Sequence, residues 1–217
     1  QTELWKTYSD DVKQNVKIIL VDDGSAEDQK LSKLLPRDTG MTVELYEVLE
    51  DIPWNECGAN NLGLHVCSST WVLRNDFDYL IPKHTMDIVL HRQLDPNVFY
   101  LFPARYWSGP GQPPTPEGGL PVGPNIFLMT KDLFWRAGGY DEDFIGHHGS
   151  DMIFRWQLYR IAKEHRINDG HVEAVLNGSG HILPRDATRS YALLEQKKVG
   201  KVPISKDYMR FKWQRVY

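Results

Sequence analysis

The chain has 217 residues, 41% of them hydrophobic, which is enough for one substantial core and predicts a single domain. The formal net charge of −4 gives no basic excess, which excludes the electrostatic signature of a nucleic-acid-binding protein. Two cysteines, Cys57 and Cys67, are too few for a disulfide framework or a zinc site. Because neither a signal peptide nor a membrane-spanning run is visible, we expect free thiols and a cytoplasmic location.

Helical and strand patterns alternate along most of the chain. Amphipathic spacing predicts helices over residues 2–14, 27–35, 55–68, 83–94, 131–137 and 150–161. Short apolar or alternating runs predict strands over residues 16–21, 42–48, 71–75, 98–102, 126–129 and 171–176. This alternation predicts an α/β fold with a mixed, mostly parallel sheet and helices on both faces.

Two further segments lack such a pattern. Residues 103–124 are rich in proline and glycine, which predicts one long loop of the kind that serves as a lid, a binding loop or a disordered segment. From about residue 184 the chain is basic with interleaved aromatic residues. This tail could contact a membrane surface, an anionic glycan or a diphosphate, but a solvated charged face with buried aromatic side chains is the favoured interpretation.

Acidic pairs follow two of the predicted strands. Asp22 and Asp23 end the first strand, and Asp76 and Asp78 end the third. Ligands gather at the carboxyl ends of strands in such sheets, and side chains two residues apart in an extended chain share one side. Their oxygen atoms suit a hard divalent cation, and the cation in turn suits a diphosphate. A solvated turn is the alternative.

With these residues placed, the chain resembles GT-A fold glycosyltransferases of the family 2 type, the inverting class that uses nucleotide sugars. The resemblance rests on four segments: Ile18-Ile19-Leu20-Val21-Asp22-Asp23-Gly24-Ser25, Gly58-Ala59-Asn60-Asn61-Leu62-Gly63, Asp76-Phe77-Asp78, and Gly138-Gly139-Tyr140-Asp141-Glu142-Asp143-Phe144 through Gly149-Ser150-Asp151. It implies the Rossmann-like GT-A fold, with a nucleotide-sugar half at about 1–102, an acceptor half at about 103–183 and a basic tail at 184–217.

The chain also departs from the pattern of that family. It starts at the family's first helix, so the strand that usually precedes this helix is absent or lies upstream. Asn60 stands where arginine is common, and Ser150-Asp151 stands where Glu-Asp is common. The loss of one acid bears chiefly on the identity of the acceptor.

The resemblance implies transfer of a sugar from a nucleoside diphosphate sugar, expected to be a UDP-sugar, to a hydroxyl of a glycan or another acceptor, as in polysaccharide biosynthesis. Asp78 would bind Mn2+ or Mg2+, with Asp76 beside it and His181 completing the metal shell. Asp151 would be the general base. For Asp151 the alternative is an acid that complements the helix N-terminus, and for His181 it is an ordinary surface histidine.

The remaining candidates would contact donor or acceptor. They are Asp22, Asp23, Asn61 and Arg74 for the nucleotide, Trp107 for donor or acceptor, and His147, His148 and Ser150 for the acceptor. Two other functions stay open. A nucleotidyltransferase should show a glycine-rich phosphate loop near its start, and a non-catalytic glycan- or nucleotide-binding domain would not need the intact acids Asp76, Asp78 and Asp151.

Overall fold

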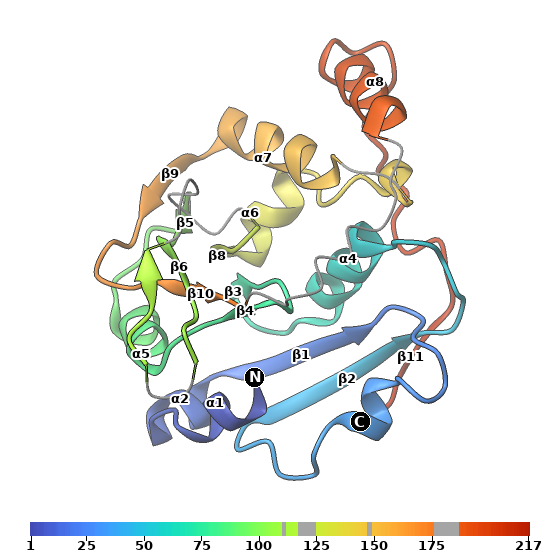
Figure 1. Cartoon of the computed structure of the whole chain (residues 1–217). Helices are drawn as coiled ribbons and strands as arrows, with labels where there is room; N and C mark the ends of the chain where they lie inside the picture. The colour runs from blue at the N-terminus through green and yellow to red at the C-terminus, as the bar shows by residue number, and fades with distance from the viewer. Residues whose placement is uncertain (110–111, 117–124, 147–148, 176–186) are drawn as a thin grey trace.

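In the computed structural model, the described residues are 1–109, 112–116, 125–146, 149–175 and 187–217. They form three small β-sheets with helices around them (Figure 1). The predicted α/β class with mixed sheets is confirmed, although antiparallel pairings are more common among these residues than the alternation of strands and helices predicts.

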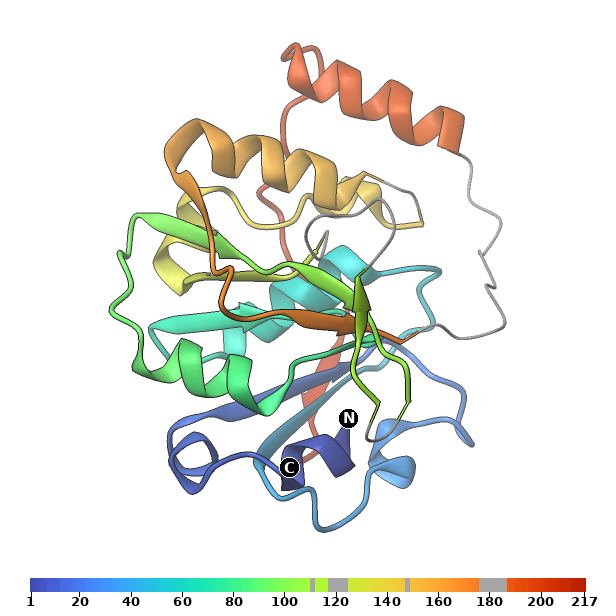
Figure 2. The same cartoon turned by 60° about the vertical axis from the view of Figure 1, so that its left-hand side comes forward.

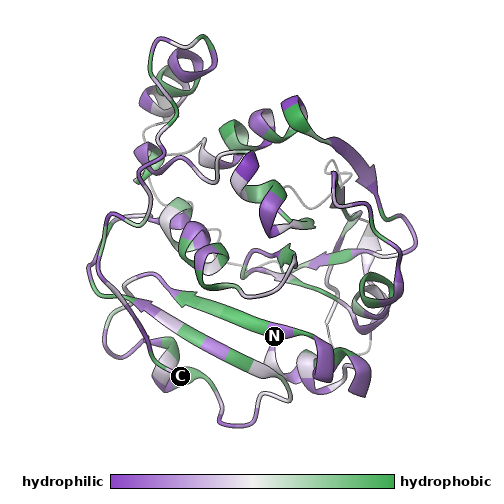
Figure 3. Ribbon diagram, turned by 180° about the vertical axis from the view of Figure 1, so that it is seen from behind, coloured by the Kyte–Doolittle hydropathy of each residue, from purple (hydrophilic) through white to green (hydrophobic). Residues whose placement is uncertain are grey.

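The first sheet joins the two ends of the chain. Strand β1 (Lys17–Asp22) pairs in parallel with β2 (Thr42–Val48), and β11 (Trp213–Arg215) pairs antiparallel with the other edge of β2. The run Ile-Ile-Leu-Val in β1 makes this strand hydrophobic along its length (Figure 3). The C-terminal residues therefore return to the part of the fold built by the first fifty.

The second sheet lies at the centre of the molecule. It has the order β3–β8–β5–β9, with β3 antiparallel to β8 and β9 parallel to β5. Its strands are β3 (Trp71–Arg74), β5 (Val98–Leu101), β8 (Phe127–Thr130) and β9 (Lys163–Arg166). All four residues of β8 are buried, which is expected of a strand paired on both edges.

The third sheet has the order β4–β10–β6–β7. Its strands are β4 (Tyr79–Leu80), β6 (Ala104–Tyr106), β7 (Thr115–Pro116) and β10 (Val172–Ala174). Strand β4 directly follows the Asp76-Phe77-Asp78 segment and pairs antiparallel with β10. The C-terminal end of this acidic turn is therefore anchored in the third sheet.

The helices cover both sides of the first two sheets (Figures 1 and 2). They are α1 (Thr2–Lys6), α2 (Asp10–Asn15), α3 (Leu31–Leu34), α4 (Glu56–Val66), α5 (Lys83–His91), α6 (Lys131–Arg136), α7 (Ser150–Ile161) and α8 (Ala187–Lys198), with a 3-10 turn η1 (Glu142–Phe144). One hydrophobic cluster includes residues of α1, α2, α5 and the central strands, and a second includes residues of α4, α6 and α7. Helix α8 packs on α7 through Leu194 and Ile153.

None of the helices in the described part of the chain combines the length and apolar character that crossing a bilayer requires.

Several predicted elements differ in their bounds. The helix predicted over residues 2–14 is two helices, because the Ser9 hydroxyl accepts the Val12 N–H and starts a new helix there. The helix predicted over 27–35 is reduced to α3, because the Asp22 carboxylate accepts the Leu31 N–H and leaves the preceding residues in turns. Gly149, and not Ser150, occupies the position before α7.

The prediction of one long loop over residues 103–124 was wrong in part, because this range includes β6 and β7. The tail, for which no element was predicted, includes α8 and β11. In the tail, Phe211 is buried against Tyr46 and Leu62, whereas Tyr191, Trp213 and Tyr217 are exposed, so the prediction of buried aromatic side chains holds only in part.

Candidate functional site

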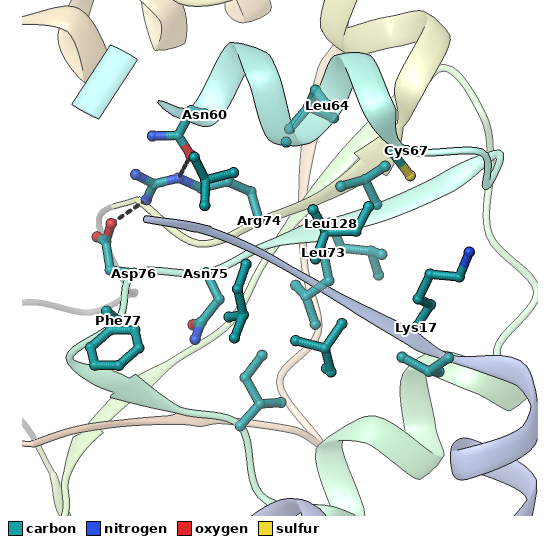
Figure 4. A pocket seen from close by; sticks show the side chains of 18 of the residues that line it. Lys17, Asn60, Leu64, Cys67, Leu73, Arg74, Asn75, Asp76, Phe77 and Leu128 are labelled. Carbon is teal, nitrogen blue, oxygen red and sulfur yellow. Dashed lines mark hydrogen bonds and ion pairs between the residues drawn. The ribbon is translucent and has the colours of Figure 1, made fainter. Parts of the chain in front are cut away.

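A cavity of about 1250 Å³ lies between β1 and β3 (Figure 4). One end, which we call the polar end, is lined by charged residues: Asp23, Glu56, Arg74, Asp76, Asp78 and Asp151. The remainder, which we call the apolar slot, runs along the two strands and is lined chiefly by Ile18, Leu20, Leu64, Trp71, Leu73 and Leu128. The polar end lies at the carboxyl ends of β1 and β3, where an α/β sheet binds its ligands.

Arg74 organises the polar end. Its side chain is 6% exposed, and its guanidinium group lies 2.8 Å from Glu56 Oε1 and 2.6 Å from Asp76 Oδ1. The Nε–H donates to Asn60 Oδ1 at 2.9 Å (Figure 4), and another N–H donates to the backbone carbonyl of Asn125. Arg74 therefore links Asp76 in the acidic turn to Glu56 and Asn60 in α4.

The two acids of the Asp76-Phe77-Asp78 turn differ in environment. Asp76 is held by Arg74, and burial raises the pKa of its carboxyl group. The Asp78 side chain is exposed at the cavity and makes no ion pair with any residue that the structure describes. Its backbone carbonyl accepts the N–H of Val175 at 2.8 Å, which fixes the turn against the third sheet. Asp78 is thus the carboxylate best placed to meet a cation.

The donor set of this turn fits a divalent cation that arrives with a diphosphate. Carboxylate oxygens suit Mg2+ and Mn2+, and Mg2+ is commonly held by one or two carboxylates together with substrate phosphates and water. Among the described residues, no group of three or more His, Cys, Asp or Glu side chains is arranged to hold a metal. A cation bound at this turn would therefore need further ligands beyond the described side chains, such as oxygen atoms of a diphosphate.

Asp151 reaches the same cavity from another element, helix α7. It stands in the first turn of α7, after Gly149, whose φ of 109° sets the entry of the helix. Asp151 lines the same cavity as Asp76 and Asp78. Burial raises the pKa of the Glu56 carboxyl group, and the charges of Asp76 and Asp151 raise it further against the opposing effect of Arg74. The polar end therefore concentrates negative charge, which attracts cations.

Asp22 and Asp23 have separate roles. Asp22 is buried, and its carboxylate accepts the backbone N–H groups of Ser25 at 3.0 Å and Leu31 at 2.7 Å. Asp23 lines the cavity and accepts from the backbone and side-chain N–H groups of Asn55. Burial raises the pKa of Asp23. Asp22 therefore shapes the loop, whereas Asp23 reaches the polar end.

Asn61 and Trp107 do not line this cavity. Asn61 is fully buried, donates to the Tyr140 carbonyl and to Glu142, and accepts the Tyr140 N–H. These bonds join α4 to the segment before η1 and use both the amide oxygen and the amide nitrogen of Asn61. Trp107 follows β6, is half-buried and donates its backbone N–H to the Ala174 carbonyl.

Among the other predicted residues, Ser150 is buried beside Asp151 and lines the cavity. The predicted metal ligand His181 and the predicted acceptor contacts His147 and His148 lie outside the described residues.

Glu56, Asn60 and Trp54 line the polar end but were not predicted from the sequence as functional residues. Glu56 looks like an ordinary acid in the first turn of a helix, which the helix dipole favours anyway. One feature of the sequence could have indicated Glu56 as a site residue. It begins α4, the helix whose Gly58–Gly63 segment carries part of the family resemblance.

The residues Asp141, Glu142 and Asp143 bind the C-terminal segment rather than the cavity. Glu142 is buried and accepts the Met209 N–H at 2.7 Å. Asp141 and Asp143 each lie 2.7 Å from the Lys197 ammonium group in α8. Among the described residues between Gly138 and Asp151, the cavity is lined by Gly149, Ser150 and Asp151.

Comparison with known proteins identifies solved structures that share the fold of this chain. No protein-family model and no curated protein sequence matches the chain. Among solved structures, GalNAc-T7 with UDP, GalNAc and Mn2+ aligns with a TM-score of 0.58 and 12% identity, over 87% of this chain and 46% of that one. The catalytic domain of Drosophila beta1,4galactosyltransferase 7 in complex with xylobiose aligns with a TM-score of 0.51 and 14% identity, over 78% and 74%.

A mutant of the same Drosophila enzyme in complex with manganese, UDP-Gal and xylobiose gives a TM-score of 0.52 and 16% identity, over 89% of this chain and 82% of that one. The chain therefore has the fold of GT-A glycosyltransferases, as the sequence predicted. It spans about half the length of GalNAc-T7.

Proposed function

We propose that this chain is a metal-dependent inverting glycosyltransferase, which moves a sugar from a UDP-sugar to a hydroxyl group of a glycan or a similar acceptor. The observation that carries the proposal is the meeting of Asp76, Asp78 and Asp151 in one cavity at the carboxyl ends of β1 and β3. The structural neighbours, which contain UDP or UDP-Gal and manganese, support the same reaction class.

In this proposal the acids of the β3 turn hold the donor diphosphate through a cation. Asp78 would hold Mn2+ or Mg2+, and Asp76, which pairs with Arg74, would stand beside it. When bound, the cation neutralises the charge that develops on the departing nucleoside diphosphate. Asp23, which lines the cavity at the end of β1, would accept hydrogen bonds from the ribose or the base.

Asp151 acts on the acceptor in the same proposal. Its carboxylate accepts the proton of the acceptor hydroxyl while that oxygen attacks the anomeric carbon. Inversion requires the attacking oxygen and the leaving diphosphate to lie on opposite faces of the sugar. The proposal therefore requires one sugar ring to lie between Asp151 and the acids of the β3 turn, which line the same cavity.

The test separates donor binding from acceptor activation. Calorimetry should detect UDP binding in the presence of Mn2+ and little binding in EDTA. Replacement Asp78→Asn should weaken Mn2+-dependent UDP binding at least tenfold, about 1.4 kcal/mol. Replacement Asp151→Asn should leave UDP binding intact and abolish transfer. Asp132→Asn, on the exposed face of α6, is a matched control for the loss of one acid.

Metal-independent binding of UDP, or binding equal in wild type and Asp78→Asn, would contradict the proposed role of the β3 turn. UDP binding without transfer or hydrolysis of any UDP-sugar would instead assign the chain to the class of non-catalytic nucleotide-binding domains.

A further inference from the structure

The polar end contains an acid that the proposed transfer does not use. Glu56 stands in the first turn of α4 and lines the cavity together with Asp76 and Asp151, with its side chain 27% exposed. The helix dipole favours an acid in a first helical turn, but it does not require that acid to reach a cavity. Neither cation binding nor proton removal gives this carboxylate a role.

Acids from three elements converge around one buried hydroxyl group, that of Tyr140. Burial raises the pKa of Tyr140, and the charges of Glu56, Asp76 and Asp151 raise it further, whereas the charge of Arg74 lowers it. Because Coulomb interactions weaken with distance, α4, the β3 turn and α7 all bring their carboxylates near this hydroxyl group. Glu56 therefore lies close to the place that the proposed transfer assigns to the sugar ring, between Asp151 and the β3 turn.

The side chain of Glu56 can accept further hydrogen bonds. Among the described residues its only side-chain partner is Arg74, whose guanidinium group lies 2.8 Å from Oε1. A carboxylate offers about four acceptor sites, so the second oxygen stays open to a ligand. Arg74 is held in turn by Asn60 and Asp76 (Figure 4), which fixes the direction of the Glu56 side chain. Glu56 is thus a preorganised acceptor at the wall of the cavity.

Positive charge around the cavity is already neutralised by acids of the protein. The basic residues that line it, in the part of the chain that the structure describes, are Lys17, Arg74 and Arg92. Lys17 pairs with Glu44, Arg92 with Asp169, and Arg74 with both of its carboxylates. Figure 4 shows Lys17 at the other end of the cavity from Arg74. The polar end therefore offers an acidic sugar no counter-charge from these residues.

A neutral hexose and a uronic acid would meet this wall in different ways. The hydroxyl groups of a hexose can donate to the Glu56 carboxylate, and hydrogen bonds to an ionised acceptor are about twice as strong as those between neutral groups. The carboxylate of a uronic acid would instead lie beside like charges, which is strongly unfavourable. Binding sites commonly reject a wrong ligand in this way, through unpaired or repelling charge.

We infer that Glu56 binds hydroxyl groups of the sugar that is transferred, and that it restricts the donor to UDP-sugars with an uncharged ring. Glu56 is then the residue that selects the donor sugar, whereas the acids of the β3 turn hold the diphosphate and Asp151 acts on the acceptor. This inference rests on the proposed function and adds to it the class of donor sugar and the side chain that recognises it.

The test measures binding by calorimetry in Mn2+ at neutral pH. The probes are UDP and two matched pairs of donors, UDP-glucose with UDP-glucuronate and UDP-galactose with UDP-galacturonate, which differ within each pair only at C6. Wild type should bind the neutral member of at least one pair at least about tenfold more tightly than the acidic member. Glu56→Gln removes the charge, and its amide oxygen can still accept from Arg74. It should bring the two affinities to within about threefold and leave UDP binding unchanged.

A second variant, Glu56→Asp, separates charge from reach. The shorter side chain keeps the negative charge, so the acidic donors should stay excluded. The neutral donors should lose affinity relative to UDP, because hydrogen bonds weaken steeply once the acceptor is drawn back. Asp132→Asn is the matched control, because Asp132 is also an acid of a first helical turn that pairs with an arginine, but on the surface. It should leave every affinity unchanged.

UDP binding with the same preference between neutral and acidic donors in wild type and Glu56→Gln would overturn this inference and leave the proposed function standing. Tighter binding of an acidic donor by wild type would do the same. Loss of UDP binding in Glu56→Gln would show that Glu56 acts only by holding Arg74, which also contradicts the inference. Absence of Mn2+-dependent UDP binding in wild type would overturn the proposed function, and this inference with it.

Discussion

The ammonium group of Lys197 lies 2.7 Å from the carboxylate of Asp141, and neither side chain is exposed to solvent. Lys197 also lies 2.7 Å from Asp143 and donates to the Pro203 carbonyl at 2.8 Å. A buried charge is tolerated only when it is paired and hydrogen-bonded, so these contacts fix α8 to the segment around η1. The C-terminal part of the chain is thereby attached to the same loop that leads into Asp151.

We predict that Lys197→Met destabilises the protein by about 3–5 kcal/mol, because it leaves Asp141 buried without its counter-charge. Urea unfolding measures this loss. Lys198→Met is the matched control on the same helix, because Lys198 pairs with the exposed Glu195, and it should change stability by at most about 0.5 kcal/mol. Equal losses of stability in the two variants would contradict the view that the Lys197–Asp141 ion pair fixes α8 to the segment around η1.

The pairing of His171 with neighbouring groups leads to a pH prediction. Burial lowers the pKa of His171 below its usual 6.5, and the charges of Arg105 and His84 lower it further, while Glu173, 3.1 Å away, opposes them. The ring of His84 lies 4.7 Å from that of His171. Between the two pKa values the unfolded chain binds more protons than the folded one, so stability must fall as the pH falls from about 6.5.

Thermal unfolding between pH 7.5 and 5.5 checks this. His171→Gln should flatten the decline, because the substituted side chain takes up no proton. His91→Gln should leave the decline in place, because hydrogen bonding to the Asp87 backbone raises the pKa of this exposed histidine. Parallel curves for wild type and His171→Gln would show that another group causes the acid sensitivity.

The sequence predicted the elements whose pattern is local. Strand β2 was predicted with its observed bounds, and the strand and helix on either side of Thr130 were found because Thr130 caps α6. Strand β11 was missed, because its three residues carry no apolar pattern and owe their conformation to pairing with β2, far away in sequence. The split between α1 and α2 was missed because the amphipathic spacing continues across the Ser9 cap.

The same distinction applies to the site. The acids at the strand ends were recognisable because their position follows from the strand pattern, and the structure brings Asp76, Asp78 and Asp151 to one cavity. The burial of Asn61 was not predictable, because it results from bonds to Tyr140 and Glu142, about eighty residues away. The nucleotide-binding role expected of Asn61 rested only on the family resemblance, and a resemblance in sequence does not show which residues Asn61 contacts.

Arg74 offers a test of how the polar end is held together. Replacement Arg74→Leu leaves Glu56 and Asp76 without their shared counter-charge. We expect a loss of about 3 kcal/mol, at the low end for a broken buried pair because both carboxylates are about a quarter exposed. UDP binding in Mn2+ should weaken as well, since Asp76 loses the contact that orients it.

Arg74→Lys should recover only part of the stability, because one ammonium group cannot bind both carboxylates in the geometry of the guanidinium fork. Arg136→Leu is the control, because Arg136 pairs with Asp132 on the surface and should cost at most about 0.5 kcal/mol. Full activity in Arg74→Leu would show that Asp76 needs no positioning by this residue.

Gly149 connects the backbone of the loop to the candidate base. Its φ of 109° is rarely open to other residues, and a Cβ atom would lie 3.0 Å from the Phe144 ring. Gly149→Ala should therefore shift the start of α7 and move Asp151, with a loss of about 1–3 kcal/mol in stability. Transfer should fall at least tenfold while Mn2+-dependent UDP binding is kept, because the β3 turn is not altered.

Gly200→Ala, at φ 75° with no atom within 4 Å of the added Cβ, controls for backbone strain alone. Equal loss of UDP binding and transfer in Gly149→Ala would place this glycine with the donor rather than the acceptor.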